Sequence, residues 1–459
     1  MLQRYWHLFG TPLLAGALLR VLWLTNLPRI MVWDEVDYHS LGKQLASGGG
    51  YGVQLFPPGW PMLLGLIYRA TGAYALHGMW FNLLVSLLTI VLVGHIALRY
   101  TDPLTARCTA WLVALMPSYI LTTGMLVYEV WLQCLLVLAL VLALHERWTW
   151  LDGLLLACIT ALVALMRPFW LALPVLLWLV VRPPSRQSIA VLLLAQLGAL
   201  LLVAPWVAHI SMLRGEFVPI GLNGNINFWI GNNRNATGTF MEPPYGYWLT
   251  YSDIARDRAL AYLQEHPFHM VRLVPLKLWH MLATEAFSGL YGFLLFETHM
   301  PIPLVVRWLV DALLNGSYWL ICGLACVGIG VLVRRRQWIV LAPLLLFTYN
   351  LACHILFFGL PRFRWPVQFV LLLYAAAGLT WLIQSYSAHR SRQPGGTSHR
   401  LAAGSDGPRH TRHHQHHQRN NYTDRHALGA ASQVGLRKNS SASTASIRGK
   451  RTPNTAGTS

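Results

Sequence analysis

The polar segment from Trp33 to Pro61 carries the side chains best suited to chemistry in the first hundred residues. Asp34 and Glu35 follow directly on an apolar run, where a chain leaving a bilayer would lie at the membrane surface. A carboxylate at that depth can accept the proton of a hydroxyl group onto which an enzyme moves another group. Asp34, with Asp37 three residues later, is equally suited to cap a helix N-terminus. Position alone does not separate the two roles, and one acid can serve both.

A second acid lies inside an apolar run. Glu129 is roughly one helical turn from the expected outer end of residues 126–144. A charge at such a depth is expensive and is a functional hypothesis by default, although closeness to the interface lowers the cost. We therefore favour a functional role for Glu129 over a structural one.

Two arginines alternate in the segment 359–366. If this segment is extended, the guanidinium groups of Arg362 and Arg364 point to one side and suit a phosphate oxygen. The alternative is that both side chains reach towards lipid headgroups. Other cations and acids are each interpreted as structural when taken alone: Arg29, Arg167, Arg234, Lys277, His95, Asp152 and Glu285.

The composition defines the class of protein. Of the 459 residues, 55% are hydrophobic and only 11% are charged, against about 25% in soluble domains. Apolar runs close to the length that crosses a bilayer as helix predict an all-α integral membrane protein, a bundle of about 10–11 transmembrane helices. The predicted spans are 9–27, 77–98, 108–124, 126–144, 151–166, 168–182, 189–210, 309–333, 338–358 and 365–385, with a shorter apolar piece at 62–70.

The net charge of +18 does not indicate nucleic-acid binding. More than half of it lies beyond residue 385, in a segment poor in large apolar residues that we expect to be a disordered, basic cytoplasmic tail, 386–459. The basic residues between spans place both termini in the cytoplasm and residues 28–76, 211–308 and 359–364 outside. The polar segments named above therefore share the outer face.

Smaller elements are expected to surround the outer loops. Tyr38, Leu41 and Leu45 recur at helical spacing and predict a short helix on the membrane surface. The Gly/Asn-rich stretch 223–238 is typical of a loop and is expected to line a pocket. Residues 252–266 predict a helix capped by Ser252, followed by a second helical piece. The six cysteines all lie in apolar runs and are interpreted as buried thiols, and no metal or other cofactor is expected.

The order of these features resembles a known enzyme family. The landmarks are Asp34-Glu35, Tyr38, Gly49, Tyr51, Pro57-Pro58-Gly59 and Pro61, then Pro117, Glu129, Arg167-Pro168, Gly231-Asn232-Asn233 to Gly238, His266-Pro267, Lys277 and Arg362-Phe363-Arg364. In this order they are similar to GT-C-type glycosyltransferases related to protein O-mannosyltransferases and lipid A aminoarabinose transferases. The resemblance covers residues 1–385.

The resemblance implies transfer of a sugar from a polyprenyl-phosphate carrier to an acceptor hydroxyl, on the outer face and with inversion. Asp34 would be the catalytic base, with Glu35 and Glu129 beside it. The predicted donor-phosphate ligands are Arg362, Arg364 and Lys277, and the predicted pocket residues are Tyr38, Asn232 and Asn233. The expected partners are the lipid-linked donor, membrane lipid and a hydroxyl acceptor, and the expected location is a bacterial plasma membrane.

A transporter or flippase of lipid-linked substrates is the alternative function. Transporters place ionisable residues and broken helices near the bilayer midplane, often in matched halves. Here the charges gather at span ends and the opening segment has no second copy in the sequence. We therefore favour an enzyme.

Overall fold

The computed structural model describes residues 2–26, 31–181, 185–243, 248–286 and 303–392. Within these ranges every regular element is an α-helix or a short 3-10 helix. By its internal contacts the chain divides into Met1–Pro394 and Gly395–Ser459. The predicted tail was 386–459: its residues 386–392 are helical and not disordered, and the rest, from 393, lies outside the described residues, as does Arg29. The account below concerns the first unit.

The helices long and apolar enough to cross a membrane are α1 (Leu2–Asn26), α4 (Ala75–Tyr100), α10 (Arg186–Arg214), α15 (Leu304–Arg334) and α17 (Phe369–Arg392). A sixth candidate is the pair α5 (Pro103–Leu115) and α6 (Pro117–Thr123), which bends by 51°. The bend falls at Pro117, which lacks the backbone N–H that would bond to Val113.

Four of the predicted spans are occupied by shorter apolar helices. They are α7 (Glu129–Ala143), α8 (Trp150–Met166), the 3-10 turn η1 (Pro168–Ala172) with α9 (Leu173–Val181), and the 3-10 turn η2 (Trp338–Leu341) with α16 (Pro343–Ile355). Each of the ten predicted apolar runs therefore contains helix. The predicted all-α membrane bundle is confirmed as a fold. Among the described residues, five helices, or six if the bent pair is one span, meet the length expected of a full span.

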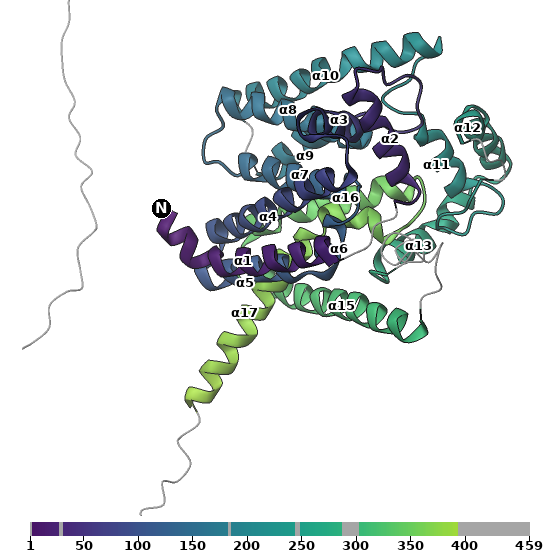
Figure 1. Cartoon of the computed structure of the whole chain (residues 1–459). Helices are drawn as coiled ribbons and strands as arrows, with labels where there is room; N and C mark the ends of the chain where they lie inside the picture. Colours follow the sequence, from purple (N-terminus) through teal and green to yellow (C-terminus); the bar gives the residue numbers. More distant parts are fainter. Residues whose placement is uncertain (1, 27–30, 182–184, 244–247, 287–302, 393–459) are drawn as a thin grey trace, which may run out of the picture. The chain divides into compact units, whose positions relative to one another are not determined.

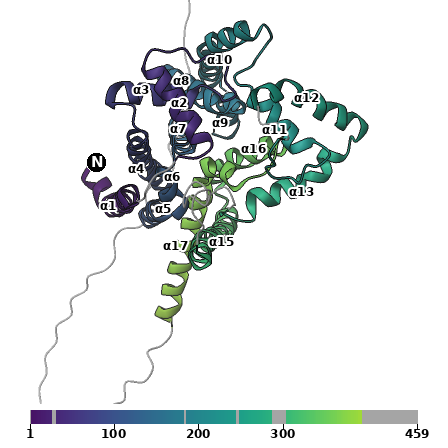
Figure 2. The same cartoon turned by 45° about the vertical axis from the view of Figure 1, so that its right-hand side comes forward.

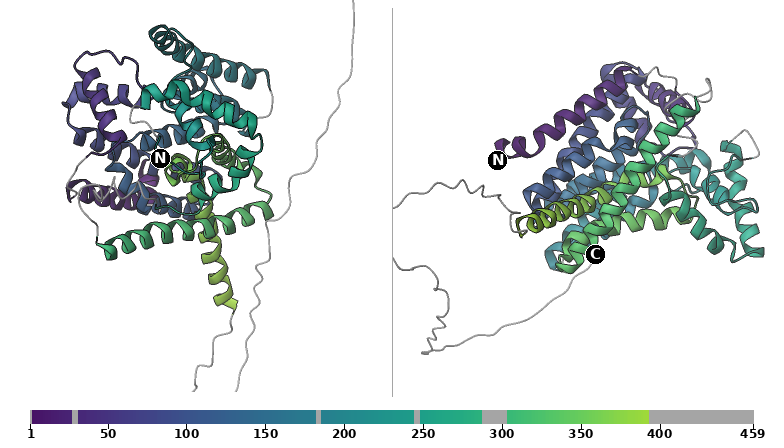
Figure 3. Two further views of the ribbon diagram at one scale, coloured as in Figure 1. Left: turned by 90° about the vertical axis from the view of Figure 1, so that its right-hand side faces the viewer. Right: turned by 90° about the horizontal axis from the view of Figure 1, so that it is seen from below.

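The bundle packs through one large apolar core. Buried side chains from α4, α5, α7, α8, α15 and α17 meet in it, including Ile90, Ala110, Leu136, Leu156 and Leu372. Helix α15 packs across α17, as the left view of Figure 3 shows. The crossing needs glycine on both helices: a Cβ at Gly328 would lie 1.9 Å from the carbonyl oxygen of Tyr374, and one at Gly378 would lie 2.1 Å from that of Leu324.

Five short helices gather at one end of the bundle (Figures 1 and 2). They are α2 (Asp34–Ala46), α3 (Gly59–Thr71), α11 (Asn223–Asn232), α12 (Trp248–Glu265) and α13 (His269–Leu282). The helix predicted around Tyr38 is therefore confirmed as α2, and Tyr38 and Leu41 of its apolar stripe are buried within the protein. Helix α2 begins with Asp34, Glu35 and Asp37 in its first turn, where negative charge is favourable towards the helix dipole.

Three local expectations were wrong. The N-cap of α2 is Trp33, so Asp34 is the first helical residue and not the cap. The Gly/Asn-rich stretch is helical over its first ten residues, as α11. Helix α12 begins before Ser252, whose hydroxyl instead donates to the carbonyl oxygen of Leu222 at 2.7 Å.

Candidate active site

Three charged side chains from distant parts of the chain form the candidate active site, which we call the Asp34 cluster. They are Asp34 at the start of α2, Glu129 at the start of α7, and Arg362 in the 3-10 helix η3 (Pro361–Val367). Arg362 Nε donates to Glu129 Oε1 at 2.6 Å and Nη2 to Glu129 Oε2 at 3.4 Å. Its Nη1 donates to Asp34 Oδ2 at 2.8 Å. One guanidinium group thus bridges two carboxylates.

The two acids differ in access to solvent. The Asp34 side chain is 33% exposed, whereas the Glu129 side chain is 1% exposed. Glu129 also lies 3.9 Å from Arg167 Nη2. Asp34 can therefore meet an incoming group, while Glu129 is enclosed between two arginines.

Glu129 is positioned by the segment that follows the bent pair α5–α6. Asn82 donates to the carbonyl oxygen of Met125 at 2.8 Å, and Trp60 donates to that of Leu126 at 3.1 Å. The backbone N–H of Leu126 donates to Glu35 Oε1 at 2.7 Å. Side chains from three other helices thus hold the backbone that leads into Glu129.

Glu35 differs from Asp34 in being buried and bonded to backbone N–H groups. Glu35 is 1% exposed, and its second oxygen accepts the N–H of Val32 at 3.3 Å. The carboxylate of Glu35 thus links the backbone before α2 to the backbone before α7. The predicted catalytic pair therefore divides into an accessible acid, Asp34, and a buried acid that positions it.

The backbone just before Asp34 is strained. Trp33 has φ 48° and ψ −126°, a conformation that L-residues with side chains rarely adopt. Such a residue costs about 1–3 kcal/mol and persists only where the surroundings impose it. The strain turns the chain so that Asp34 opens α2 facing Arg362.

Arg167 forms a second layer behind Glu129. Its Nε donates to the hydroxyl of Tyr128 at 2.8 Å, and its Nη1 contacts Nε2 of His354. His354 Nδ1 lies 2.7 Å from the carbonyl oxygen of Asn350, so Nδ1 carries the proton and Nε2 accepts from Arg167. The ring of Phe363 lies 4.7 Å from the guanidinium carbon of Arg167.

Taken alone, Arg167 gave no sign of this role. The signal in the sequence is its place at the end of an apolar run, directly before Pro168. His354 was missed altogether, because it lies within a predicted span and its partners are distant in sequence.

The charges of the cluster act on one another. Burial alone lowers the pKa of Arg362, but the carboxylates of Glu129 and Asp34 outweigh burial and hold that pKa well above its ordinary value. Arg362 therefore stays protonated. Burial, followed by the charge of Asp34, raises the pKa of Tyr38 well above 10. Tyr38 packs against Phe56 and Tyr128 with ring centroids 5.0 and 6.2 Å apart, and so forms an apolar wall beside Asp34.

The predicted residues Lys277, Asn232 and Asn233 lie in a neighbouring group. Lys277 Nζ is fully buried and donates to Asn232 Oδ1 at 3.0 Å and to the carbonyl oxygen of Ile355 at 2.9 Å. Asn233 Nδ2 donates to the carbonyl oxygen of Trp229 at 2.9 Å. The Lys277 bonds tie α11 and α13 to the segment that leads into η3, whereas the Asn233 bond is local to the end of α11.

Close backbone approach makes this arrangement dependent on glycine. A Cβ at Gly231 would lie 1.7 Å from the carbonyl oxygen of Phe357, and one at Gly359 would lie 2.1 Å from that of Lys277. Larger residues at either position would push η3 away from α11 and α13.

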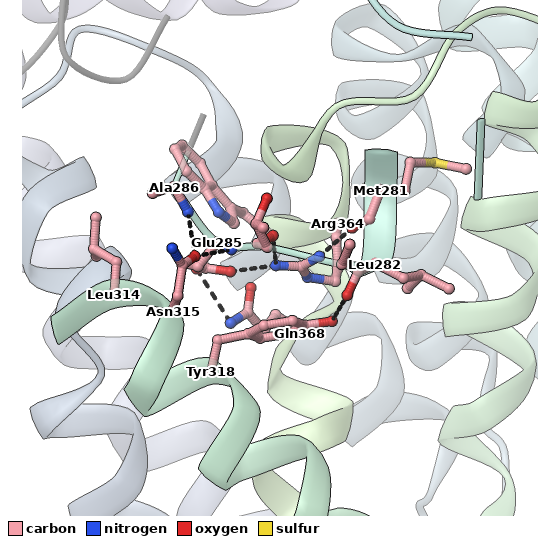
Figure 4. A network of polar contacts seen from close by, with 12 residues as sticks. Met281, Leu282, Glu285, Ala286, Leu314, Asn315, Tyr318, Arg364 and Gln368 are labelled. Carbon is pink, nitrogen blue, oxygen red and sulfur yellow. Dashed lines mark hydrogen bonds and ion pairs between the residues drawn. The ribbon is translucent and has the colours of Figure 1, made fainter. Parts of the chain in front are cut away.

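Arg364 lies in a different environment from Arg362. It is fully buried, pairs with Glu285 and donates to the carbonyl oxygens of Met281 and Thr284 (Figure 4). Its guanidinium carbon lies 3.9 Å from the ring centroid of Tyr318. Gln368 Nε2 donates to Glu285 Oε1 at 3.3 Å. We call Arg364, Glu285 and Gln368 the Arg364 cluster.

The expectation that Arg362 and Arg364 point to one side is wrong. It assumed an extended segment, and residues 361–367 form a 3-10 helix instead. With three residues per turn, positions i and i+2 face different directions. The two guanidinium groups consequently reach separate acids. Among the described residues no group of three His, Cys, Asp or Glu side chains is arranged to hold a metal ion.

The fold is of the GT-C type, the class named by the sequence resemblance. It is similar to the apo form of the oligosaccharyltransferase of Archaeoglobus fulgidus, with a TM-score of 0.50 at 14% sequence identity, over 84% of this chain and 52% of that chain. A second structure of the archaeal enzyme, AglB, in complex with an inhibitory peptide and a dolichol-phosphate, gives a TM-score of 0.49 at 14% identity, over 85% of this chain and 52% of that one. The chain thus spans about half the length of these solved structures. No protein-family model and no curated protein sequence matches it.

Proposed function

We propose that this chain is a membrane glycosyltransferase that moves a sugar from a polyprenyl-phosphate carrier to an acceptor hydroxyl, on the extracytoplasmic face and with inversion. The observation that carries the proposal is the Asp34 cluster: a solvent-accessible carboxylate held 2.8 Å from a buried, permanently charged arginine. Its setting in a GT-C-type fold supports it.

Asp34 and Arg362 are suited to the two parts of the transfer, activation of the acceptor and departure of the phosphate. In the reaction the acceptor oxygen forms a bond to the anomeric carbon while its proton passes to an oxygen of Asp34. The bond between the anomeric carbon and the phosphate oxygen breaks, and its electron pair leaves with the polyprenyl phosphate. The leaving phosphate gains negative charge, which the Arg362 guanidinium is suited to balance.

The two roles are coupled through Arg362. Nη1 of Arg362 is bonded to Asp34, while Nε and Nη2 are bonded to Glu129. A donor phosphate competes with Asp34 for Nη1, and Glu129 keeps the guanidinium in place during the exchange. Asp34 is then released to accept a proton once the donor has bound.

The remaining predicted residues have supporting parts in this proposal. Lys277 and Asn232 hold the wall next to η3, and the buried charge of Lys277 adds to the positive potential around the donor phosphate. Glu35 fixes the start of α2, and Arg364 fixes the middle of η3 through Glu285. A polyprenyl tail gains about 0.8 kcal/mol per buried CH₂, which keeps such a donor in the bilayer with its phosphate at headgroup depth.

The domain and location assignments belong to the same proposal. Residues 1–385 would carry the reaction, with 386–459 as a cytoplasmic tail of a multi-pass plasma-membrane protein. Helix α17 continues to Arg392, so its last turns would extend past that boundary.

Mass spectrometry of cell-envelope glycans with and without the protein tests the function. We expect a glycan that carries one sugar fewer, and a build-up of polyprenyl-phosphate-linked sugar, when the protein is absent or carries Asp34→Asn. Unchanged glycans, together with movement of labelled lipid-linked sugar across proteoliposomes, would replace this proposal by a transporter.

A further inference from the structure

A cavity lies between α2 and α3, away from the Asp34 cluster. Its volume is about 470 Å³, and its polar lining comes from Lys43, Gln44, Ser47, Tyr68 and Arg69. Lys43 is nine positions after Asp34, about two and a half helical turns, so the two side chains leave opposite faces of α2. The cavity is therefore a separate site.

The lining carries two positive charges and no acid. Among the described residues, the side chains of Lys43 and Arg69 make neither an ion pair nor a hydrogen bond. The other polar side chains are already engaged: the Tyr68 hydroxyl is 2.9 Å from His39 Nδ1, and the Ser47 hydroxyl donates to the carbonyl oxygen of Gln44 at 2.9 Å. Burial, followed by the charge of Lys43, lowers the pKa of His39. The unmatched charges thus come from both walls of one hollow.

The cavity lies where lipid headgroups are expected. Its lining includes Ala73, two residues before the apolar helix α4 begins. Tyr74, between them, is 69% exposed, as is typical of an aromatic side chain at the interface. On α3, Leu66 is 68% exposed and lies on the same helix face as Arg69, three residues later. A cationic hollow therefore adjoins an apolar surface.

We propose that this cavity binds the phosphate of an anionic phospholipid, with Lys43 and Arg69 on the headgroup and the acyl chains along Leu66 and the start of α4. The site is independent of the transfer reaction. Helices α2 and α3 pack closely at Gly42 and Gly65, since a Cβ at Gly42 would lie 2.9 Å from Leu64 Cβ. A lipid bound to both helices stabilises the pair that presents Asp34.

Native mass spectrometry of the full-length protein, released from nanodiscs, tests the site. The nanodiscs contain phosphatidylcholine alone or with phosphatidylglycerol. We expect retained phosphatidylglycerol, bound roughly 30-fold more weakly by the Lys43→Gln/Arg69→Gln variant. Arg272→Gln is the matched control, because Arg272 is an exposed cation on α13, outside the cavity. Ala73→Phe fills the hollow with both charges kept, and is expected to lower retention as well.

Three results would overturn the proposal. The first is equal retention of phosphatidylglycerol by the wild type, the double variant and Ala73→Phe. The second is preferential, Lys43- and Arg69-dependent binding of polyprenyl monophosphate, which would make this a carrier site. The third is binding of inorganic phosphate, in detergent without lipid, as strong as the binding of phosphatidylglycerol. That result would make the cavity a site for a soluble anion.

Discussion

Arg362 and Arg364 are two residues apart, yet they serve different kinds of cluster. Arg362 bridges Asp34 and Glu129, and the Asp34 side chain remains 33% exposed. Arg364 and Glu285 are both fully buried, and Gln368 completes their enclosure. Each cluster pairs an arginine with a buried glutamate. The difference is that the Asp34 cluster contains a second carboxylate, Asp34, which reaches solvent.

The short helix η3 directs its two arginines to different clusters, one at the candidate active site and one in the buried core. Because η3 turns through about 120° per residue, Arg362 faces α2 and α7 while Arg364 faces α13 and α15. A buried ion pair is weak evidence for stability, but losing one partner leaves an uncompensated charge. We therefore expect the Arg364 cluster to govern folding and the Asp34 cluster to govern transfer.

The largest expected effect is on folding, at Arg364. Arg364→Met leaves Glu285 buried without its cation and should lower the free energy of unfolding by about 3–5 kcal/mol. Adding Glu285→Met should restore most of that loss, because two apolar side chains replace two charges. Reversible unfolding in mixed micelles measures both. If the double variant also loses sugar transfer at normal stability, the Arg364 cluster is not merely structural.

The next effect is on transfer, at Arg362. Arg362→Lys keeps the charge, but one ammonium group cannot bridge Asp34 and Glu129 as the guanidinium fork does. We expect the transfer rate to fall roughly 100-fold. Stability should change less, since Glu129 retains Arg167 at 3.9 Å. Arg272→Lys, at an exposed position of α13, is the control. Normal transfer by Arg362→Lys would remove the bidentate bridge from the account.

The smallest effect concerns a third buried cation, Lys277, whose hydrogen-bond partners are neutral. Burial lowers the pKa of Lys277 from 10.5 to about 8. Between these values the unfolded chain binds more protons than the folded chain, so stability rises with pH. Relative to Lys277→Met, the free energy of unfolding should rise by about 2 kcal/mol from pH 8 to pH 9.5. Parallel stability curves for the two proteins would show that Lys277 titrates normally.

The sequence predicted the helices better than the site. All ten apolar runs contain helix, because long hydrophobic segments in a membrane have few other ways to satisfy their backbone. Helix ends and loops were predicted less accurately. Ser252 looked like a cap, and the Gly/Asn-rich stretch looked like a loop, but tertiary contacts with Leu222 and Leu356 decided both.

The candidate residues were largely foreseen, but their partners were not. Asp34, Glu129 and Arg362 were each named as candidates from the sequence and lie together in the structure, although up to 328 positions separate them. Their catalytic and binding roles stay predictions. No local sequence pattern indicates that Arg364 pairs with Glu285, or that Arg167 contacts His354. These pairings depend on the direction in which each helix presents its side chains. Sequence spacing alone does not determine that direction when the type of helix is unknown.

The most direct test of the central claim is sugar transfer by purified Asp34→Asn protein, reconstituted with a labelled polyprenyl-phosphate-linked hexose. Asp37→Asn, three residues later on α2, is the matched control. We predict that Asp34→Asn releases polyprenyl phosphate roughly 10²- to 10⁴-fold more slowly at an unchanged melting temperature, while Asp37→Asn stays close to the wild type. Wild-type release by Asp34→Asn would contradict the assignment of Asp34 as the base.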